Sequence, residues 1–256
     1  MTMTEKHPRT MDKKAMIFAA GLGTRLAPLT DNKPKALVSL NGKPLLWHVA
    51  KRLVDEGFNR ITINVHHFAQ QIIDYVKTPE YGAIASNGVE TLISDESSQL
   101  LDTGGGLRKA APLLFAKDDA PVLIHNVDIM SNADLGHLYD SAGDCDALLL
   151  VSKRATTRYL LFDDQMRMVG WINKQTGQVR TPYANIDLTR CCELAFSGIH
   201  VVSKRLIDTM QPWPDKFGIM DFYINSCKDL RIQGLEQPGL AITDIGKIDV
   251  LRKLQS

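Results

Sequence analysis

The chain has 256 residues, of which 44% are hydrophobic, and a formal net charge of +1. That length suits one large α/β domain, and a near-neutral chain with no basic face argues against a protein that binds nucleic acid through phosphate electrostatics. No apolar run approaches the ~20 residues of a membrane span, and the polar start lacks the apolar core of a secretory signal. Four cysteines without metal-type spacing indicate reduced thiols, so we expect a cytoplasmic protein without nucleic-acid or membrane partners.

The first half of the chain alternates segments typical of strands and of helices. Continuous apolar or β-branched runs predict strands, and apolar residues at helical spacing predict the helices between them. The expected strands are Lys14–Ala20, Arg60–His66, Val89–Asp95, Pro121–Asn126 and Asp146–Ser152. The expected helices are residues 44–57, 69–77 and 106–115. This alternation predicts an α/β fold with a Rossmann-like, mostly parallel sheet sandwiched by helices, whose ligands bind at the carboxyl ends of the strands.

After about Arg154 the pattern changes to shorter strands separated by turns. The expected strands here are residues 159–162, 168–173 and 194–202, followed by helices at 218–230 and 247–255. We interpret this region as a small antiparallel β extension that continues the sheet. We expect residues 1–10 to be a disordered extension and residues 11–256 to form a single domain.

A glycine loop with two cations follows the first strand. Gly21 and Gly23 let the backbone approach a ligand closely, and consecutive N–H groups in such a loop form an anion nest. Arg25 and Lys35 add donors suited to phosphate oxygens. A dinucleotide fingerprint would need glycine or alanine at Leu26, and no segment matches a Walker A loop. The loop therefore predicts a phosphate binder, and the alternative is a plain strand-to-helix turn.

The whole segment AAGLGTRLAPLTDNKPKALVSLNGKPLL resembles the signature of sugar-1-phosphate nucleotidylyltransferases. These GT-A-like enzymes join a nucleoside triphosphate to a sugar 1-phosphate and release pyrophosphate. The resemblance implies that Arg25 binds the departing pyrophosphate portion and that Lys35 binds the phosphates near the reacting phosphorus. It also implies a nucleotide-binding half, 11–153, and a sugar-phosphate-binding half, 154–256. The loop residues implied to bind the nucleotide are Ala20, Gly21, Leu22, Gly23 and Thr24.

A second matching segment, LLDTGGGLRKA, has three glycines that open a helix. Their bare N–H groups and the positive end of the helix would face the edge of the sheet. The resemblance implies nucleotide contacts from Thr103, Gly104 and Gly105, and Gln99 is a candidate for a hydrogen bond to the base. The Thr-Gly-Gly-Gly form is similar to the branch that uses UTP and N-acetylmuramic acid 1-phosphate, which implies a place in peptidoglycan recycling. The alternatives are a flexible loop before a helix and, for Gln99, an exposed polar residue.

Two aspartates far apart in the chain resemble the metal ligands of the family. VLIHNVDIM delivers Asp128 just past the end of a strand, with Asn126 as a nucleotide contact, and GLAITDIGKIDVL supplies Asp244. Mg²⁺ prefers one or two carboxylates with substrate phosphates, so both aspartates are implied to bind Mg²⁺, and Asp128 counts as catalytic. The alternatives are a turn cap and a helix cap. Ile242 and Lys247 replace the usual tryptophan and threonine, which affects sugar and ribose contacts more than the metal.

The sugar-phosphate side resembles the family more loosely. FSGIH would line the sugar pocket with Ser197 and Gly198, and WINKQ provides Lys174 for the sugar phosphate, with Asn173 in place of the usual glutamate. Asp221 is a further candidate for a contact with the sugar. A solvated lysine and a helix-capping or surface aspartate are the alternative interpretations.

Together these matches, from Lys14 to Leu254, predict transfer of a nucleotidyl group from UTP to N-acetylmuramic acid 1-phosphate. A mannose-1-phosphate guanylyltransferase, or another hexose-1-phosphate nucleotidyltransferase, is the alternative within the same chemistry. A nucleotide-sugar sensor without turnover is the alternative from another class. The expected partners are the two small-molecule substrates, and the expected assembly is a monomer or a homodimer.

Overall fold

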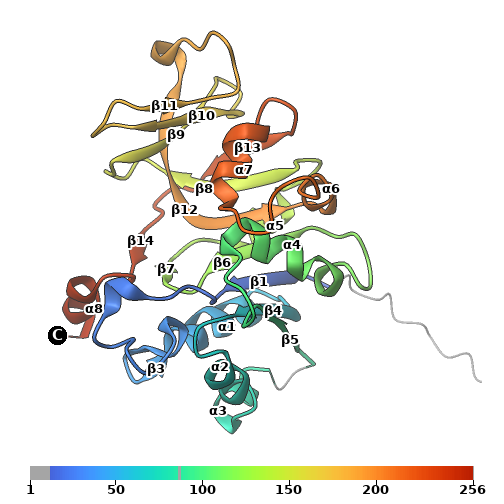
Figure 1. Cartoon of the computed structure of the whole chain (residues 1–256), viewed down its shortest axis with the longest axis vertical. Coiled ribbons are helices and arrows are strands. Elements are labelled where there is room, and N and C mark those ends of the chain that lie inside the picture. The colour runs from blue at the N-terminus through green and yellow to red at the C-terminus, as the bar shows by residue number, and fades with distance from the viewer. Residues whose placement is uncertain (1–11, 86–87, 256) are drawn as a thin grey trace, which may run out of the picture.

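One ten-stranded sheet runs through the molecule in the order β11-β10-β9-β12-β6-β1-β4-β5, and β8 joins β12 to β13. The computed structural model describes residues 12–85 and 88–255 (Figure 1). The extension expected at residues 1–10 lies outside the described residues. The predicted α/β class is confirmed: the sheet is mixed, has a parallel core and carries helices on both faces.

The parallel core contains four of the five strands predicted in the first half of the chain, and the fifth, at residues 146–152, pairs antiparallel with a later strand. The four core strands are β1 (Lys14–Phe18), β4 (Arg60–Val65), β5 (Glu90–Asp95) and β6 (Val122–Asn126). All residues of β1 and β4 are buried, as expected for parallel strands covered on both faces. Phe18 pairs with Asn64 on one side and with Asn126 on the other. The carboxyl ends of these strands therefore coincide at one edge of the sheet.

Helices cover the two faces of the sheet because β1 sends alternate side chains into two separate cores. Ala15 and Ile17 pack in one core, and Met16 and Phe18 pack in the other. The first core is covered by α1 (Leu45–Asp55), α2 (Ala69–Tyr75), α3 (Pro79–Gly82), α5 (Leu135–Asp140) and α8 (Ile248–Gln255). The second core is covered by α4 (Asp102–Leu114), α6 (Lys204–Asp208) and α7 (Ile219–Ser226).

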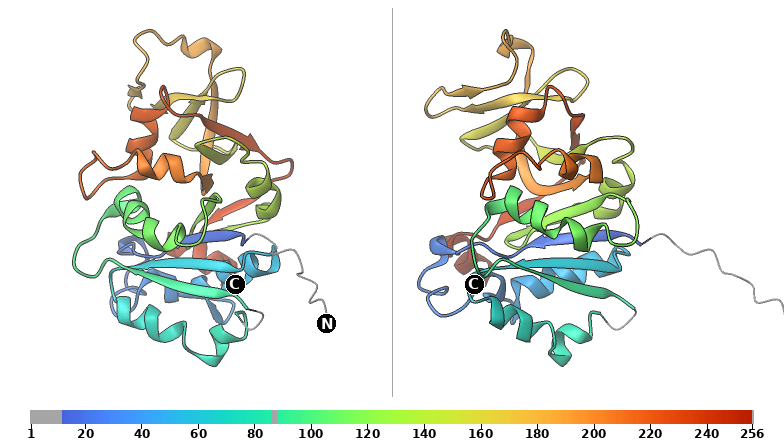
Figure 2. Two further views of the ribbon diagram at one scale, coloured as in Figure 1. Left: turned by 90° about the vertical axis from the view of Figure 1, so that its right-hand side faces the viewer. Right: turned by 45° about the vertical axis from the view of Figure 1, so that its right-hand side comes forward.

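The antiparallel extension lies at one end of the molecule, opposite α2 and α3 (Figure 2). It is built on β12 (Cys192–Val202), which pairs with β6 near its end and with β9 near its start. The other strands of the extension are β9 (Arg158–Phe162), β10 (Met168–Asn173) and β11 (Val179–Arg180), and a 3₁₀ turn, η3, spans Leu188–Arg190. Beside it, β8 (Ala147–Ser152) pairs with β12, and β13 (Ile232–Glu236) pairs with β8 in parallel. Because β8 pairs with β12 and β13, the two expected halves of the chain interlock in one sheet.

Short elements surround the edge of the sheet at which the parallel strands end. The glycine loop leads into the 3₁₀ turn η1 (Thr24–Leu26), and a second 3₁₀ turn, η2, spans Lys35–Leu37. β2 (Ser39–Leu40) and β3 (Lys43–Pro44) form a small hairpin ahead of α1. A separate antiparallel pair joins β7 (Ile129–Ser131) to β14 (Ile242–Asp244). This pairing brings the end of the chain back to the end of β6.

Candidate active site

The two aspartates predicted from distant parts of the chain meet at the carboxyl edge of the parallel core. Asp128 follows β6, and Asp244 ends β14, which pairs with the strand directly after Asp128. The amide of Ile245 donates a hydrogen bond to the carbonyl of Asp128 over 2.8 Å. The β7–β14 pairing therefore places the two carboxylates side by side, as the sequence predicts.

Both predicted cations reach this acidic pair, Asp128 and Asp244. Lys35 Nζ lies 2.9 Å from Asp128 Oδ2, and the Arg25 guanidinium lies 3.9 Å from Asp128 and 3.8 Å from Asp244. The side chain of Asp128 is 7% exposed, whereas Arg25 is 58% exposed and Asp244 is 45% exposed. The buried carboxylate is thus held in place, and the more exposed arginine is free to meet a ligand.

Gly246 lies against three of these charged groups, Arg25, Asp128 and Asp244. A Cβ at this position would lie 2.7 Å from Arg25 Nη2, 2.7 Å from Asp128 Oδ2 and 2.8 Å from Asp244 Oδ1. The amide of Gly246 also donates to Asp244 Oδ1 over 2.8 Å. Only a residue without a side chain leaves this space open, so the glycine shapes the acidic pair as well as the turn.

The acidic pair fits a hard divalent cation. Oxygen ligands from one or two carboxylates, completed by substrate phosphates, are what Mg²⁺ prefers. Within residues 12–85 and 88–255, no group of three or more His, Cys, Asp or Glu side chains forms a complete protein-only metal site. A two-carboxylate site that needs the substrate for its remaining ligands is consistent with both observations.

The glycine loop borders a cavity of about 460 Å³, which we call the loop cavity. Gly23 has a φ of 69°, and its carbonyl accepts a hydrogen bond from Thr30 Oγ1 over 3.0 Å. A Cβ on Gly23 would lie 3.0 Å from side-chain atoms of both Thr30 and Lys35, so this turn requires glycine. The predicted nucleotide-binding residues that line the loop cavity are Ala20, Gly21, Leu22, Gly23, Thr24 and Thr103.

Three polar residues that line the loop cavity, Asn64, Glu96 and Asp102, were missed by the sequence reasoning. Asn64 accepts a hydrogen bond from the amide of Ala19 over 2.8 Å and donates to Glu96 Oε1 over 2.8 Å. Glu96 is fully buried, its Oε2 has no hydrogen-bond partner in the described part of the chain, and burial raises its pKa. An acid directly after the strand Glu90–Asp95 was the available signal, because that position lies at the ligand-binding edge.

The expectation of bare N–H groups at Gly104 and Gly105 is wrong. Helix α4 begins at Asp102, four residues before the expected start, and both glycine amides donate to the carbonyl of Phe217, over 2.9 and 3.3 Å. A Cβ on Gly104 would lie 2.2 Å from the Phe217 ring, and one on Gly105 would lie 2.1 Å from the Asp215 carbonyl oxygen. These glycines let α4 pack closely on the segment before α7, and neither lines the loop cavity.

Thr103 and Gln99 differ in position from those glycines. Thr103 lines the loop cavity, and its hydroxyl oxygen accepts a hydrogen bond from the amide of Ile219 at the start of α7 over 2.9 Å. Gln99 is exposed and lies outside the residues that line this cavity. The structure therefore provides no support for a contact between Gln99 and the base.

On the sugar-phosphate side, one predicted residue approaches the acidic pair through the backbone. Gly198 has a φ of 83°, and a Cβ there would lie 2.7 Å from the side-chain nitrogen of Asn126, two residues before Asp128. Ser197 is buried, and its hydroxyl is satisfied by the backbone of Ile199. Gly198 thus lets β12 pack closely against the end of β6, whereas the side chain of Ser197 hydrogen-bonds within its own strand.

Lys174 does not reach the cavities at the edge of the sheet. Its ammonium nitrogen lies 2.8 Å from Glu193 Oε1, on an exposed part of the antiparallel extension. Asp221 does line a cavity, of about 390 Å³, and its Oδ1 lies 2.7 Å from Arg180 Nη1. The solvated interpretation of Lys174 agrees with this geometry, whereas Asp221 stays a candidate.

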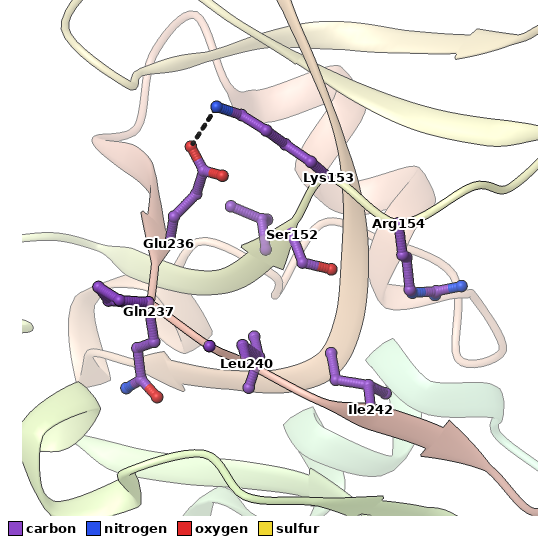
Figure 3. Close-up of a pocket in the computed structure, with 10 residues that line it drawn as sticks. Ser152, Lys153, Arg154, Glu236, Gln237, Leu240 and Ile242 are labelled. Carbon is purple, nitrogen blue, oxygen red and sulfur yellow. Dashed lines mark ion pairs between the residues drawn. The ribbon is translucent and has the colours of Figure 1, made fainter.

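A cavity of about 600 Å³ lies where β8 ends beside the link from β13 to β14 (Figure 3). Lys153 and Glu236 form an ion pair of 4.0 Å on one side of it. Arg154 extends away from that pair, and it also lines the 390 Å³ cavity that contains Asp221. Ile242 contributes to the lining two residues before Asp244, so this cavity adjoins the acidic pair.

Residues 14–159 match the family model described as nucleotidyl transferase. The chain belongs to the nucleotidyl transferase family. A curated relative of this nucleotidyl transferase, the N-acetylmuramate alpha-1-phosphate uridylyltransferase of Caulobacter vibrioides, is 31% identical over 234 residues, which cover 89% of this chain and 90% of the relative. A second relative with the same name, from Neisseria meningitidis serogroup B, is 39% identical over 130 residues, which cover 50% of this chain and 52% of the relative.

Solved structures agree with the fold of this nucleotidyl transferase. The structure of HddC from Yersinia pseudotuberculosis, complexed with GMP-PN, superposes with a TM-score of 0.71 at 22% identity and covers 94% of this chain and 97% of that chain. Family membership and the whole-chain relative make the chain a sugar-1-phosphate nucleotidyltransferase. Among its described helices, none is long and apolar enough to span a bilayer.

Proposed function

We propose that this nucleotidyltransferase transfers a uridylyl group from UTP to N-acetylmuramic acid 1-phosphate and releases pyrophosphate. The observation that carries the proposed chemistry is the convergence of Arg25, Asp128 and Asp244 beside Gly246 at the carboxyl edge of the sheet, with Lys35 paired to Asp128. The whole-chain similarity to a relative named for this activity supports the choice of substrates. Recycling of cell-wall sugar in the cytoplasm is the proposed setting.

The proposed reaction needs no general base. A phosphate monoester is largely dianionic at neutral pH, because its second pKa is about 6, so an oxygen of the sugar phosphate can attack the α-phosphorus directly. The difficulty is instead to bring two anions together in line. Residues that orient phosphates and neutralise their charge are therefore what the active site has to supply.

Different residues at the carboxyl edge of the sheet orient the phosphates and neutralise their charge. The loop from Gly21 to Gly23 faces its cavity with backbone groups suited to a triphosphate. Arg25 is exposed enough to bind the departing pyrophosphate, and Lys35 lies deeper, beside Asp128, where it can contact phosphates near the reacting phosphorus. Asp128 and Asp244 would hold a divalent cation, proposed to be Mg²⁺, which when bound neutralises phosphate charge.

Thr103, Asn64 and Glu96 also line the loop cavity, and we propose that they form its nucleoside side. The hydrogen-bonded chain from Ala19 through Asn64 to Glu96 holds the carboxyl group rigidly. Gly198 and Asn126 lie beside Asp128, where the sugar 1-phosphate has to arrive.

A screen of substrate pairs tests the proposal. Pyrophosphate release is measured for UTP, CTP, GTP and ATP, each combined with N-acetylmuramic acid 1-phosphate, N-acetylglucosamine 1-phosphate, glucose 1-phosphate and mannose 1-phosphate in the presence of Mg²⁺. We expect the highest kcat/KM for UTP with N-acetylmuramic acid 1-phosphate. A preference for GTP with mannose 1-phosphate would instead establish the guanylyltransferase alternative. Nucleotide binding without turnover of any pair would favour the sensor.

A further inference from the structure

Three arginines line the cavity of about 390 Å³ that contains Asp221, and we call it the arginine cavity. Arg154 follows β8, Arg158 begins β9 and Arg180 ends β11. Two strands, β9 and β11, and the loop after β8 thus each contribute one arginine to the same cavity. None of these arginines is among the residues at the carboxyl edge of the sheet, where Arg25 and Lys35 contact the acidic pair.

The positive charge of the arginine cavity is only partly balanced by the protein. Asp221 is the one carboxylate among its lining residues, and it pairs with Arg180 over 2.7 Å. Arg154 donates to the carbonyl of Phe196 over 2.9 Å. Across the part of the chain that the structure describes, neither Arg154 nor Arg158 has a carboxylate within ion-pair distance. Three cations against one anion leave a formal surplus of two positive charges.

The remaining walls of the arginine cavity suit a sugar ring. Trp171, Leu160, Phe196 and Ile224 provide apolar surface, and the Arg180 guanidinium lies 5.9 Å from the centre of the Trp171 ring. Small-molecule sites are typically apolar walls with a few polar groups that fix orientation. A ligand that combines an apolar ring face with an anionic group matches this lining.

The arginine cavity adjoins the proposed active site at two places. Gly218 lines the loop cavity, and a Cβ on it would lie 3.2 Å from Oδ2 of Asp221, which lines the arginine cavity. Phe196 precedes Gly198 by two residues, about 7 Å along a strand, and Gly198 contacts Asn126 beside the acidic pair. A sugar 1-phosphate whose phosphate binds beside the acidic pair would therefore extend its ring toward the arginine cavity.

We propose that the arginine cavity binds a carboxylate on the acceptor sugar, separate from its 1-phosphate. This inference rests on the proposed function, because it concerns the acceptor of the same reaction. N-acetylmuramic acid differs from N-acetylglucosamine by a lactyl ether that ends in a carboxylate. Arginine forks bind carboxylates in a bidentate manner, so this cavity is what separates the two acceptors.

Arg158 is the cleanest position for the test, because removing Arg180 would leave Asp221 unpaired. The variant Arg158→Gln is compared with Arg190→Gln, which removes an exposed arginine from the same extension but outside the arginine cavity. Each protein is assayed for pyrophosphate release with UTP and either N-acetylmuramic acid 1-phosphate or N-acetylglucosamine 1-phosphate.

We expect the unmodified protein to prefer the acceptor that carries the carboxylate. Arg158→Gln should lower kcat/KM for that acceptor by about 10- to 100-fold, the loss expected for one hydrogen bond to a charged group, and leave N-acetylglucosamine 1-phosphate nearly unchanged. Arg190→Gln should change neither value. An equal loss for both acceptors would assign Arg158 to the 1-phosphate or to folding, and no loss for either would also overturn the carboxylate site.

Failure of the proposed function gives a different result. If no nucleoside triphosphate and sugar phosphate are turned over, the proposed function is wrong, and calorimetric binding then judges the carboxylate site. Stronger binding of N-acetylmuramic acid 1-phosphate than of N-acetylglucosamine 1-phosphate, lost in Arg158→Gln, would support the site. Equal affinities of the two sugar phosphates would overturn it.

Discussion

The ammonium nitrogen of Lys35 lies 2.9 Å from Oδ2 of Asp128, and both side chains are largely buried, at 15% and 7% exposed. The two residues are far apart in the chain, one at the start of η2 and the other after β6. Burying either charge alone would be costly, so each stabilises the other in the position that the proposed chemistry needs. A substitution that removes one of these charges should therefore disturb the geometry of the active site more than the packing of the apolar core.

Replacing Asp128 by asparagine should lower kcat by about 100- to 1000-fold, as for loss of one preorganised electrostatic contact. Asparagine keeps the shape of the side chain but removes the charge that faces Lys35 and Arg25. Steady-state pyrophosphate release measures the effect on kcat, and thermal unfolding measures the effect on stability separately. Asp140→Asn, an exposed acid paired with Lys13, is the matched control. Normal turnover of Asp128→Asn would remove Asp128 from the mechanism.

Replacing Gly246 by alanine should impair catalysis more than folding. The added Cβ would press on Arg25, Asp128 and Asp244 at 2.7 to 2.8 Å, so at least one of these groups has to move. Because effective catalysis depends on alignment, we expect kcat to fall by at least about 10-fold. Gly82→Ala, where no atom lies within 4 Å of the new Cβ, should leave kcat unchanged. Equal activity of the two variants would show that the acidic pair tolerates displacement.

Replacing Gly105 by alanine should destabilise the fold. The new Cβ would lie 2.1 Å from the Asp215 carbonyl oxygen, and this backbone atom cannot move without shifting the segment before α7. Overpacking of this kind costs about 1–3 kcal/mol, which exceeds the gain of roughly 1 kcal/mol from replacing a helical glycine. Denaturant unfolding measures the difference, with Gly136→Ala as the control, since its Cβ meets nothing closer than 3.6 Å. An unchanged free energy of unfolding for Gly105→Ala would contradict the packing role.

Replacing His200 by leucine should make the protein less sensitive to acid. His200 is buried, neither ring nitrogen has a hydrogen-bond partner in the described part of the chain, and burial lowers its pKa from 6.5 to about 3. The unfolded chain therefore binds the proton more readily, and the free energy of unfolding falls as pH falls below about 6.5. This single group predicts a loss of about 2 kcal/mol between pH 7 and pH 5.

Denaturant unfolding at both pH values should show a smaller loss for His200→Leu than for the unmodified protein. His137→Leu, which replaces an exposed histidine of α5, serves as the comparison and should retain the original pH dependence. If His200→Leu loses as much stability as the unmodified protein, the acid sensitivity originates elsewhere.

Local patterns in the sequence were sufficient for the parallel core and for the position of Asp128 at its edge. Apolar runs predicted β1 and β6, because a strand buried on both faces has no polar side to alternate with, and β-branched or strand-like segments predicted β4 and β5. Since parallel strands end at one edge, the residues just after β1 and β6 had to be neighbours, which brought the glycine loop and Asp128 together. The return of Asp244 came from the family resemblance, and β14 pairing with β7 explains it physically.

Other features were decided only when distant elements packed together. Gly104 and Gly105 looked like open anion-binding backbone, but the segment before α7 occupies their N–H groups. The arginine cavity combines Arg154 from the loop after β8 with Arg158 and Arg180 from β9 and β11, and no periodicity reveals the order of these strands in the sheet. A side chain's spacing determines which face of its own element it occupies, whereas its partners depend on sheet order and helix packing, and these are properties of the whole fold.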